Sequence, residues 1–143
     1  MTLIVPDASV ILAWVLQRED EPAFASSTRL LEAYLAERVT IRLPTLWRYE
    51  VGNILGLKLR GQAIEAMDIL LAYQFPEETL SRGYCQAVLE LMRTVKGISF
   101  YDGCYHSLAM RLGGTCVTAD RRYVRRASDH GHLALVSDWR LPA

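Results

Sequence analysis

The chain has 143 residues, of which 51% are hydrophobic and 22% are charged, and its formal net charge at pH 7 is zero. This length and composition indicate one folded domain over residues 1–143 and exclude intrinsic disorder. Because there is no net positive charge, a nucleic-acid partner would have to be held by a local basic patch rather than by the field of the whole protein.

Three further features bear on the compartment. The three cysteines have no C-x-x-C spacing, which suits small core residues in a reducing environment. The longest apolar run, residues 10–16, is too short to cross a bilayer. The N-terminus lacks the basic segment of a secretory signal. We therefore expect a cytoplasmic protein that does not enter a membrane.

Hydrophobic periodicity predicts strands that alternate with helices. In chain order we expect a strand over residues 3–5, a helix over 8–16, a helix containing 30–35, a strand over 39–43 that stops at Pro44, a helix from Thr45 to about Arg60, a helix over about 64–73, a loop at 76–78, a helix around 87–95, a helix from Ser99 to Leu112, a strand over 115–118, a helix over 121–127 and a strand over 133–136. Thr45 and Ser99 are the expected N-caps. Alternation of this kind predicts an α/β fold with parallel strands and helices on both faces of the sheet.

Acidic residues stand at the strand-to-helix junctions. Asp7 follows the first strand and Asp120 follows the third, so both fall at the carboxyl ends of strands, where open parallel sheets form their sites. Each could instead be a simple N-cap, and for Asp7 alone the two interpretations are about equally good. The hydroxyl groups of Ser9 and Thr118 are placed to orient these carboxylates by hydrogen bonding.

Two more acids lie within predicted helices. Asp102 stands three residues after Ser99, which fits a capping box and does not prevent the carboxylate from facing a cation. Glu50 lies among the apolar residues of its helix, where an acid needs a partner. That partner is either a surface arginine, such as Arg48 or Arg60, or a metal ion, and burial favours the metal.

Together the four acids predict a cation site. Metal ligands must converge, whereas caps on separate helices need not, and converging acids repel each other unless a cation neutralises them. A ligand set made only of oxygens favours Mg²⁺ or Mn²⁺ over zinc or copper. A protein-held divalent cation of this kind can promote phosphodiester cleavage.

Basic and imidazole side chains complete the candidates. Arg121, Arg122, Arg125 and Arg126 follow Asp120 and form either a solvated helix face or a clamp for phosphates beside the acids. His130 and His132 lack a third nearby ligand, and His106 is more consistent with a partly buried, hydrogen-bonded side chain than with a metal ligand.

Four short blocks carry a resemblance to a known family. They are Val-Pro-Asp-Ala-Ser-Val, Leu-Trp-Arg-Tyr-Glu-Val-Gly-Asn-Ile-Leu, Ser-Phe-Tyr-Asp-Gly-Cys-Tyr-His-Ser-Leu-Ala and Val-Thr-Ala-Asp-Arg-Arg-Tyr. In this order and spacing, and over essentially the whole chain, the sequence resembles a PIN domain, and specifically the VapC-type ribonuclease toxins of prokaryotic toxin–antitoxin pairs.

The resemblance implies a PIN-like three-layer sandwich with a central parallel sheet of about four to five strands flanked by helices. It implies that Asp7, Glu50, Asp102 and Asp120 are the catalytic acids that bind Mg²⁺ or Mn²⁺, supported by Ser9 and Ser99. Some members carry a fifth acid after the fourth, where this chain has Arg121, Arg122 and Tyr123. The family also implies a homodimer and an antitoxin protein as partner.

We therefore expect metal-dependent hydrolysis of single-stranded RNA at a phosphodiester, with the arginines holding flanking phosphates. Two alternatives stay open from the sequence. One is a non-catalytic PIN module that binds RNA or a partner protein. The other is a metal-dependent phosphatase of the aspartyl-phosphate type, which is disfavoured because Ser9, not a second Asp, stands two residues after Asp7.

Overall fold

A computed structural model describes residues 1–142. Its elements are β1 (Thr2–Pro6), α1 (Ala8–Leu16), α2 (Ala23–Leu35), β2 (Val39–Ile41), β3 (Leu43–Pro44), α3 (Trp47–Lys58), the 3-10 turn η1 (Arg60–Gln62), α4 (Ala63–Ala72), β4 (Glu77–Glu78), α5 (Arg82–Thr94), α6 (Phe100–Leu112), β5 (Thr115–Thr118), α7 (Arg121–Ala127), the 3-10 turn η2 (Ser128–His130) and β6 (Leu133–Leu135). Among these residues, no helix is both long and apolar enough to cross a membrane.

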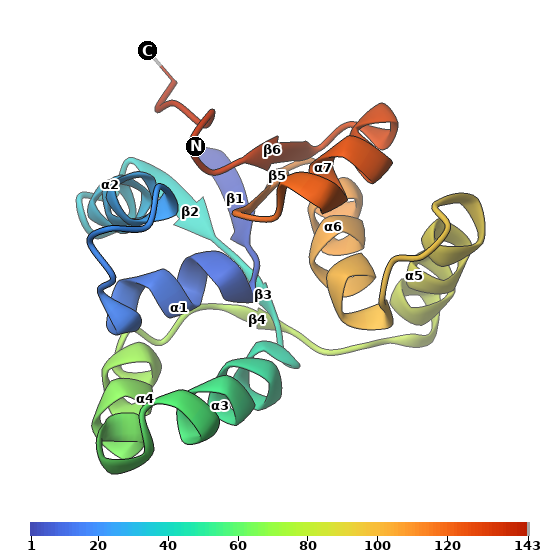
Figure 1. Cartoon of the computed structure of the whole chain (residues 1–143). Helices are drawn as coiled ribbons and strands as arrows, with labels where there is room; N and C mark the ends of the chain where they lie inside the picture. The colour runs from blue at the N-terminus through green and yellow to red at the C-terminus, as the bar shows by residue number, and fades with distance from the viewer. Residues whose placement is uncertain (143) are drawn as a thin grey trace.

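The centre of the molecule is a parallel sheet of four strands in the order β2-β1-β5-β6. Figure 1 shows α1 and α2 on one side of this sheet and α5 and α6 on the other. The short helix α7 shares a buried apolar cluster with α5, so it lies on the α5–α6 side. The predicted α/β class, parallel pairing and flanking helices are confirmed, with four strands in the main sheet.

The segment after β2 differs from the prediction. The expected strand over 39–43 divides at Arg42, and β3 leaves the main sheet to pair in parallel with β4. The predicted loop at 76–78 therefore contains a short strand, held by hydrogen bonds from the Leu43 amide to the Pro76 carbonyl and from the Thr45 amide to the Glu78 carbonyl. Sequence periodicity misses such a strand because two residues are too few to show alternation.

The helix caps were predicted with mixed success. Ser99 does cap α6, accepting a hydrogen bond from the Asp102 amide at 3.0 Å. Thr45 does not cap α3: that helix begins at Trp47, and Leu46 occupies the cap position without a side-chain hydrogen bond. Packing therefore sets the start of α3, since tertiary contacts can replace a missing cap.

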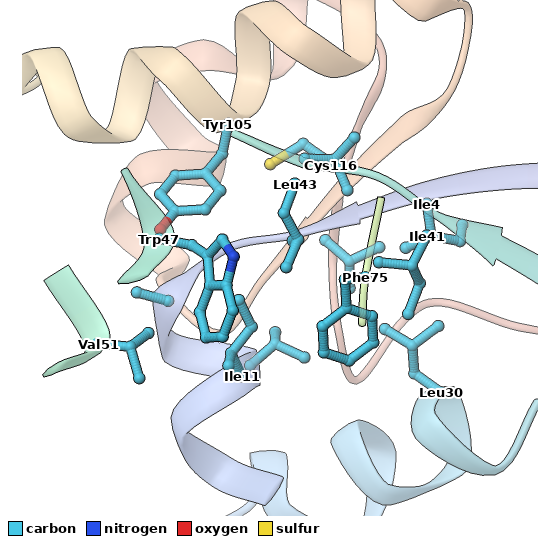
Figure 2. Close-up of a cluster of buried hydrophobic side chains, with 14 of the residues drawn as sticks. Ile4, Ile11, Leu30, Ile41, Leu43, Trp47, Val51, Phe75, Tyr105 and Cys116 are labelled. Atoms are coloured by element: carbon cyan, nitrogen blue, oxygen red, sulfur yellow. The ribbon is translucent and has the colours of Figure 1, made fainter. Parts of the chain in front are cut away.

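One hydrophobic core contains residues from the strands and helices that lead to the carboxyl edge of the sheet. Figure 2 shows its centre, where Ile4 of β1, Ile11 of α1 and Tyr105 of α6 belong to one buried cluster with Trp47 and Val51 of α3. Each of these five side chains is at most 2% exposed. Cys104 and Cys116 are buried and all three cysteines are free, as the spacing predicted. The start of α3 is thus anchored against β1 and α6.

A glycine permits the close approach of the α6–β5 turn to β1. A Cβ atom added to Gly114 would lie 2.6 Å from the carbonyl oxygen of Leu3, which is closer than nonbonded atoms allow. Because the obstacle is backbone of the central strand, it cannot move aside as a flexible side chain would.

We therefore expect Gly114→Ala to lower the free energy of unfolding by about 2 kcal/mol or more, because it overpacks the β1–β5 contact. Gly61→Ala is the matched control, since a Cβ there meets nothing within 4 Å, and it should change stability by no more than about 0.5 kcal/mol. Urea unfolding of both variants measures the difference, and equal stabilities would contradict the tight approach.

Candidate functional site

The topology makes the carboxyl ends of β1 and β5 the point where an open parallel sheet forms its site. These strands are neighbours and run parallel, but the helix after β1 lies on the α1–α2 side of the sheet, whereas the helix after β5 lies on the α5–α6 side. Chain connections that leave adjacent strands in opposite directions open a crevice at the carboxyl ends of those strands. Asp7 and Asp120 stand at these strand ends, as the sequence predicted.

Asp7 caps α1 and is held by its neighbours. Its Oδ1 atom accepts hydrogen bonds from the Ser9 amide at 3.1 Å, the Ser9 hydroxyl at 2.5 Å and the Val10 amide at 3.4 Å. The Ser9 hydroxyl also accepts a hydrogen bond from the Ala119 amide at 3.0 Å. Ser9 therefore orients Asp7, as predicted, and also ties the end of β1 to the end of β5.

Asp120 combines a cap with a position just after the end of β5. Its Oδ1 atom accepts from the amides of Arg122 and Tyr123 at 2.9 and 3.1 Å, so the cap interpretation is correct. Its own amide donates to the buried Thr118 hydroxyl at 3.0 Å. Thr118 thus supports the backbone at Asp120. A capping carboxylate that is exposed to solvent can still bind a cation.

Asp102 and Glu50 come from helices on different parts of the fold. Asp102 lies in the first turn of α6 and Glu50 in the first turn of α3, and both are half-buried. The Tyr105 hydroxyl, also on α6, donates a hydrogen bond to Oε1 of Glu50 at 2.9 Å. Arg48 does not pair with Glu50 as one interpretation expected, because its guanidinium binds Glu77 instead, at 2.8 and 3.0 Å.

The four acids act on each other electrostatically. Burial raises the pKa of Asp7 to about 6, against the lowering effect of hydrogen bonds from Ser9 and Thr118, and repulsion from Asp102 raises it further. Burial also raises the pKa of Glu50, with repulsion from Asp102 adding to it. The pKa of Asp102 is raised by burial and by repulsion from Asp120. Asp102 is therefore the acid that interacts electrostatically with each of the other three.

The carboxylate oxygens suit a hard divalent cation, although these side chains do not enclose a metal site. Among residues 1–142, no three acidic, histidine or cysteine side chains meet closely enough to enclose a metal ion. None of the four acids forms an ion pair with a described basic side chain. Carboxylates without a basic partner, of which Asp7, Glu50 and Asp102 have raised pKa values, suit Mg²⁺ or Mn²⁺, since Mg²⁺ usually binds through one or two carboxylates and keeps several waters.

The histidines have structural roles. His106 is fully buried, with Nδ1 bonded to the Tyr123 hydroxyl and Nε2 to the Gly131 carbonyl, both at 2.8 Å. Burial lowers its pKa and so favours the neutral imidazole. His132 is bonded through Nδ1 to the Gly114 carbonyl at 2.8 Å. These bonds fix His106 and His132 within the fold.

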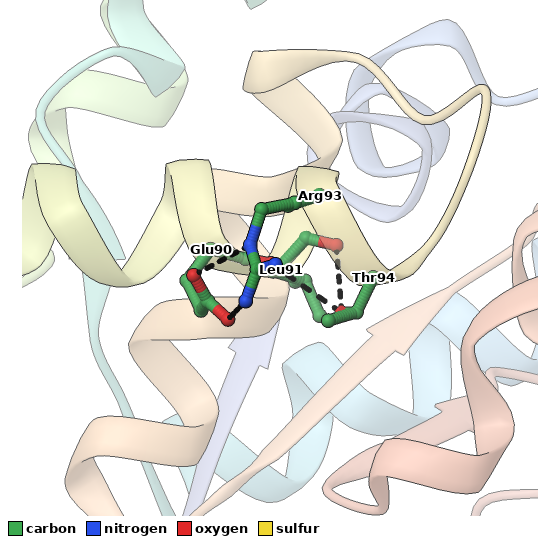
Figure 3. Close-up of polar contacts among 4 residues, drawn as sticks. All are labelled: Glu90, Leu91, Arg93 and Thr94. Carbon is green, nitrogen blue, oxygen red and sulfur yellow. Dashed lines mark hydrogen bonds and ion pairs between the residues drawn. The ribbon is translucent and has the colours of Figure 1, made fainter.

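The arginines of α7 remain available to an anion. All four are exposed, and within residues 1–142 none forms an ion pair. Arg93 on α5 is different, since Figure 3 shows its guanidinium bonded to both carboxylate oxygens of Glu90. Arg126 turns towards the Gly97 carbonyl at 3.3 Å, whereas Arg121 and Arg122 directly follow Asp120.

The structure defines a class of protein: a parallel α/β domain with acidic residues at the carboxyl ends of its two central strands. The sequence profile of the PIN domain matches residues 4–129. The chain therefore belongs to the PIN-domain family. Among curated protein sequences, none matches it significantly.

Solved structures share this fold. Over 94% of this chain and 97% of the other, it is similar to a chain of VapBC2 from Rickettsia felis, bound to a DNA fragment from its promoter, with a TM-score of 0.70 and 19% identity. PAE2754 from Pyrobaculum aerophilum aligns over 88% of this chain and 80% of its own, with a TM-score of 0.62 and 22% identity. At these identities the likeness establishes the fold.

Tyr105 is the site residue that the sequence did not single out. On this helix Tyr101 and Leu112 are 57% and 39% exposed, whereas Tyr105 is 1% exposed. Its position three residues after Asp102 was a signal, because residues at this spacing share a helix face.

Burial of Asp7 should make the metal-free protein lose stability as pH rises. In the unfolded chain the carboxyl ionises at its ordinary value of 3.8, but in the fold it does so at about 6. Below pH 3.8 Asp7 therefore does not lower the free energy of unfolding. The destabilisation grows as pH rises from 3.8 to about 6 and reaches its full size above that.

In EDTA, we expect Asp7→Asn to be more stable than the wild type by about 2 kcal/mol at pH 7.5, since Asn keeps the capping oxygen and removes the charge. The difference should shrink steadily as pH falls from 6 towards 4. Urea unfolding across this range measures it, with Asp68→Asn on the exposed side of α4 as the control. A stability difference between Asp7→Asn and the wild type that does not change with pH would mean that the ionised Asp7 carboxylate does not destabilise the fold.

Proposed function

We propose that this chain is a metal-dependent endoribonuclease that hydrolyses phosphodiester bonds of RNA, with Mg²⁺ or Mn²⁺ as cofactor. PIN domains are generally nucleases, which supports the reaction class. The observations that support the proposal are the positions of Asp7 and Asp120 at the ends of neighbouring parallel strands and the electrostatic interaction of Asp102 with Asp7, Glu50 and Asp120, with no basic side chain in an ion pair with any of the four among residues 1–142.

Asp7 and Asp102 would hold the cation directly, and Glu50 and Asp120 would hold it directly or through water. When bound, such a cation acidifies a water molecule and neutralises charge that develops on the phosphate. Because Arg121, Arg122 and Tyr123 follow Asp120 where a fifth acid would stand, this chain offers a second cation no dedicated ligand there.

The chain's own groups supply positioning. Ser9 fixes the Asp7 carboxylate, Ser99 fixes the first turn of α6 that carries Asp102, and Thr118 fixes the backbone at Asp120. A carboxylate of the four that is not engaged by the cation would accept a hydrogen bond from the attacking water and align it with the phosphorus.

The arginines of α7 would bind the phosphates that flank the scissile bond. Arg121, Arg122, Arg125 and Arg126 supply the local positive charge that a chain of zero net charge needs in order to hold RNA. Their place on the helix that directly follows Asp120 puts this charge next to the acids.

We further propose that the protein is the toxin of a toxin–antitoxin pair, with an antitoxin protein as partner. The likeness to a chain of the VapBC2 complex supports this role. An antitoxin side chain suited to the acids is arginine, whose guanidinium pairs with carboxylates through two hydrogen bonds. The homodimer and the cytoplasmic location stay predictions.

The nuclease proposal is tested by incubating the purified protein with total RNA and Mn²⁺ or Mg²⁺, with and without EDTA. We expect cuts at discrete positions that need the metal, and a loss of at least about 100-fold in rate for Asp7→Asn, because that change removes charge at the point of metal binding. Asp68→Asn, an exposed acid on α4, should cut like the wild type.

Other results would favour the two alternatives. Metal binding seen as a rise in melting temperature, without any cleavage, would support a non-catalytic module that binds RNA or a protein. Hydrolysis of a small phosphate ester, with RNA left intact, would support a phosphatase.

Replacing Arg121 and Arg122 by glutamine should weaken RNA binding about tenfold or more at low salt and flatten its salt dependence, since each phosphate contact releases counterions. The matched control is Arg93→Gln, which removes an arginine that Glu90 already neutralises. Fluorescence anisotropy with single-stranded RNA in EDTA measures affinity without cleavage. Equal losses in both variants would mean that α7 has no special part in binding.

A further inference from the structure

We propose that Tyr105 is a positioning residue that holds Glu50 in the orientation needed to bind the cation, an inference that rests on the proposed function. The Tyr105 hydroxyl donates to Oε1 of Glu50 at 2.9 Å. This bond joins the first turn of α3 to α6, and the two residues that form it are 55 positions apart in the chain.

Tyr105 is well suited to fix another side chain because it cannot move easily. Its ring is 1% exposed and belongs to the core cluster that contains Trp47 and Val51 on either side of Glu50 in the sequence. It also stands three residues after Asp102 on the same helix, so its hydroxyl relates the position of Glu50 to that of Asp102. A rigid aromatic group thereby sets the distance between two acids from separate elements.

The bond restricts what Glu50 can do. A free glutamate loses considerable rotamer entropy when it is fixed in one conformation. Because the hydrogen bond from Tyr105 already restricts the Glu50 side chain, less of that entropy is lost when a cation binds. Oε1 uses one lone pair to accept the tyrosine hydrogen bond, which leaves Oε2 as the less occupied oxygen for a cation or for a water bound to it. The direction in which Glu50 presents these oxygens is set by Tyr105. Partners of metal ligands commonly act in this way.

The test compares Tyr105→Phe with Tyr84→Phe. Both changes remove one buried hydroxyl, but that of Tyr84 donates to the backbone carbonyl of Cys104 and touches none of the four acids. Binding of Mn²⁺ alone, measured by calorimetry, should weaken about 10-fold to 100-fold in Tyr105→Phe, in line with the loss of other partners of metal ligands. Tyr84→Phe should bind Mn²⁺ like the wild type.

Cleavage kinetics separate positioning from loss of structure. In Tyr105→Phe, kcat at limiting Mn²⁺ should fall while KM for RNA stays unchanged, and excess Mn²⁺ should restore much of the rate. In a Glu50→Ala background, adding Tyr105→Phe should have no further effect on Mn²⁺ affinity, because alanine leaves no oxygen for Tyr105 to orient.

The outcomes distinguish this inference from the proposed function. If the wild type neither binds Mn²⁺ nor cuts RNA, both fall. If the wild type does both and Tyr105→Phe matches it in Mn²⁺ affinity, only the role of Tyr105 is overturned. An equal loss of affinity in Tyr84→Phe, or an additive loss in the double variant, would likewise overturn it, since the effect would then not pass through Glu50.

Discussion

The site depends on the parallel pairing of β1 with β5 at the centre of the sheet. That pairing places the ends of two strands side by side and sends the chain to opposite faces after each. The Ser9 hydroxyl completes the junction by donating to Asp7 and accepting from the Ala119 amide. A single small side chain thus fixes both the carboxylate of one strand and the backbone that leads to Asp120 from the other.

Burying like charges together works against folding, and the structure offsets only part of that cost. The pKa values of Asp7, Glu50 and Asp102 are all raised, first by burial and then by repulsion among the acids. Hydrogen bonds from serine, threonine and tyrosine hydroxyls reduce the cost without removing the charge. Strain that persists at one place in an otherwise consistent fold is the expected mark of a functional site.

The two-stranded sheet of β3 and β4 supports the start of α3. Glu77 of β4 accepts hydrogen bonds from the Trp47 indole at 2.6 Å and from the Arg48 guanidinium. These two residues open α3, which lacks a side-chain cap of its own. The β3–β4 pairing therefore secures the helix start that carries Glu50.

The sequence by itself determined the α/β class, nearly all the helices and the positions of Asp7, Asp102 and Asp120 at helix starts, because apolar periodicity and capping preferences act over a few neighbouring residues. It also identified Ser9, whose bond to Asp7 spans two residues. Only the tertiary structure decided the β3–β4 sheet, the uncapped start of α3 and the partner of Glu50. Those depend on contacts across 29 to 55 positions, which leave no local pattern, since only folding brings the two segments together.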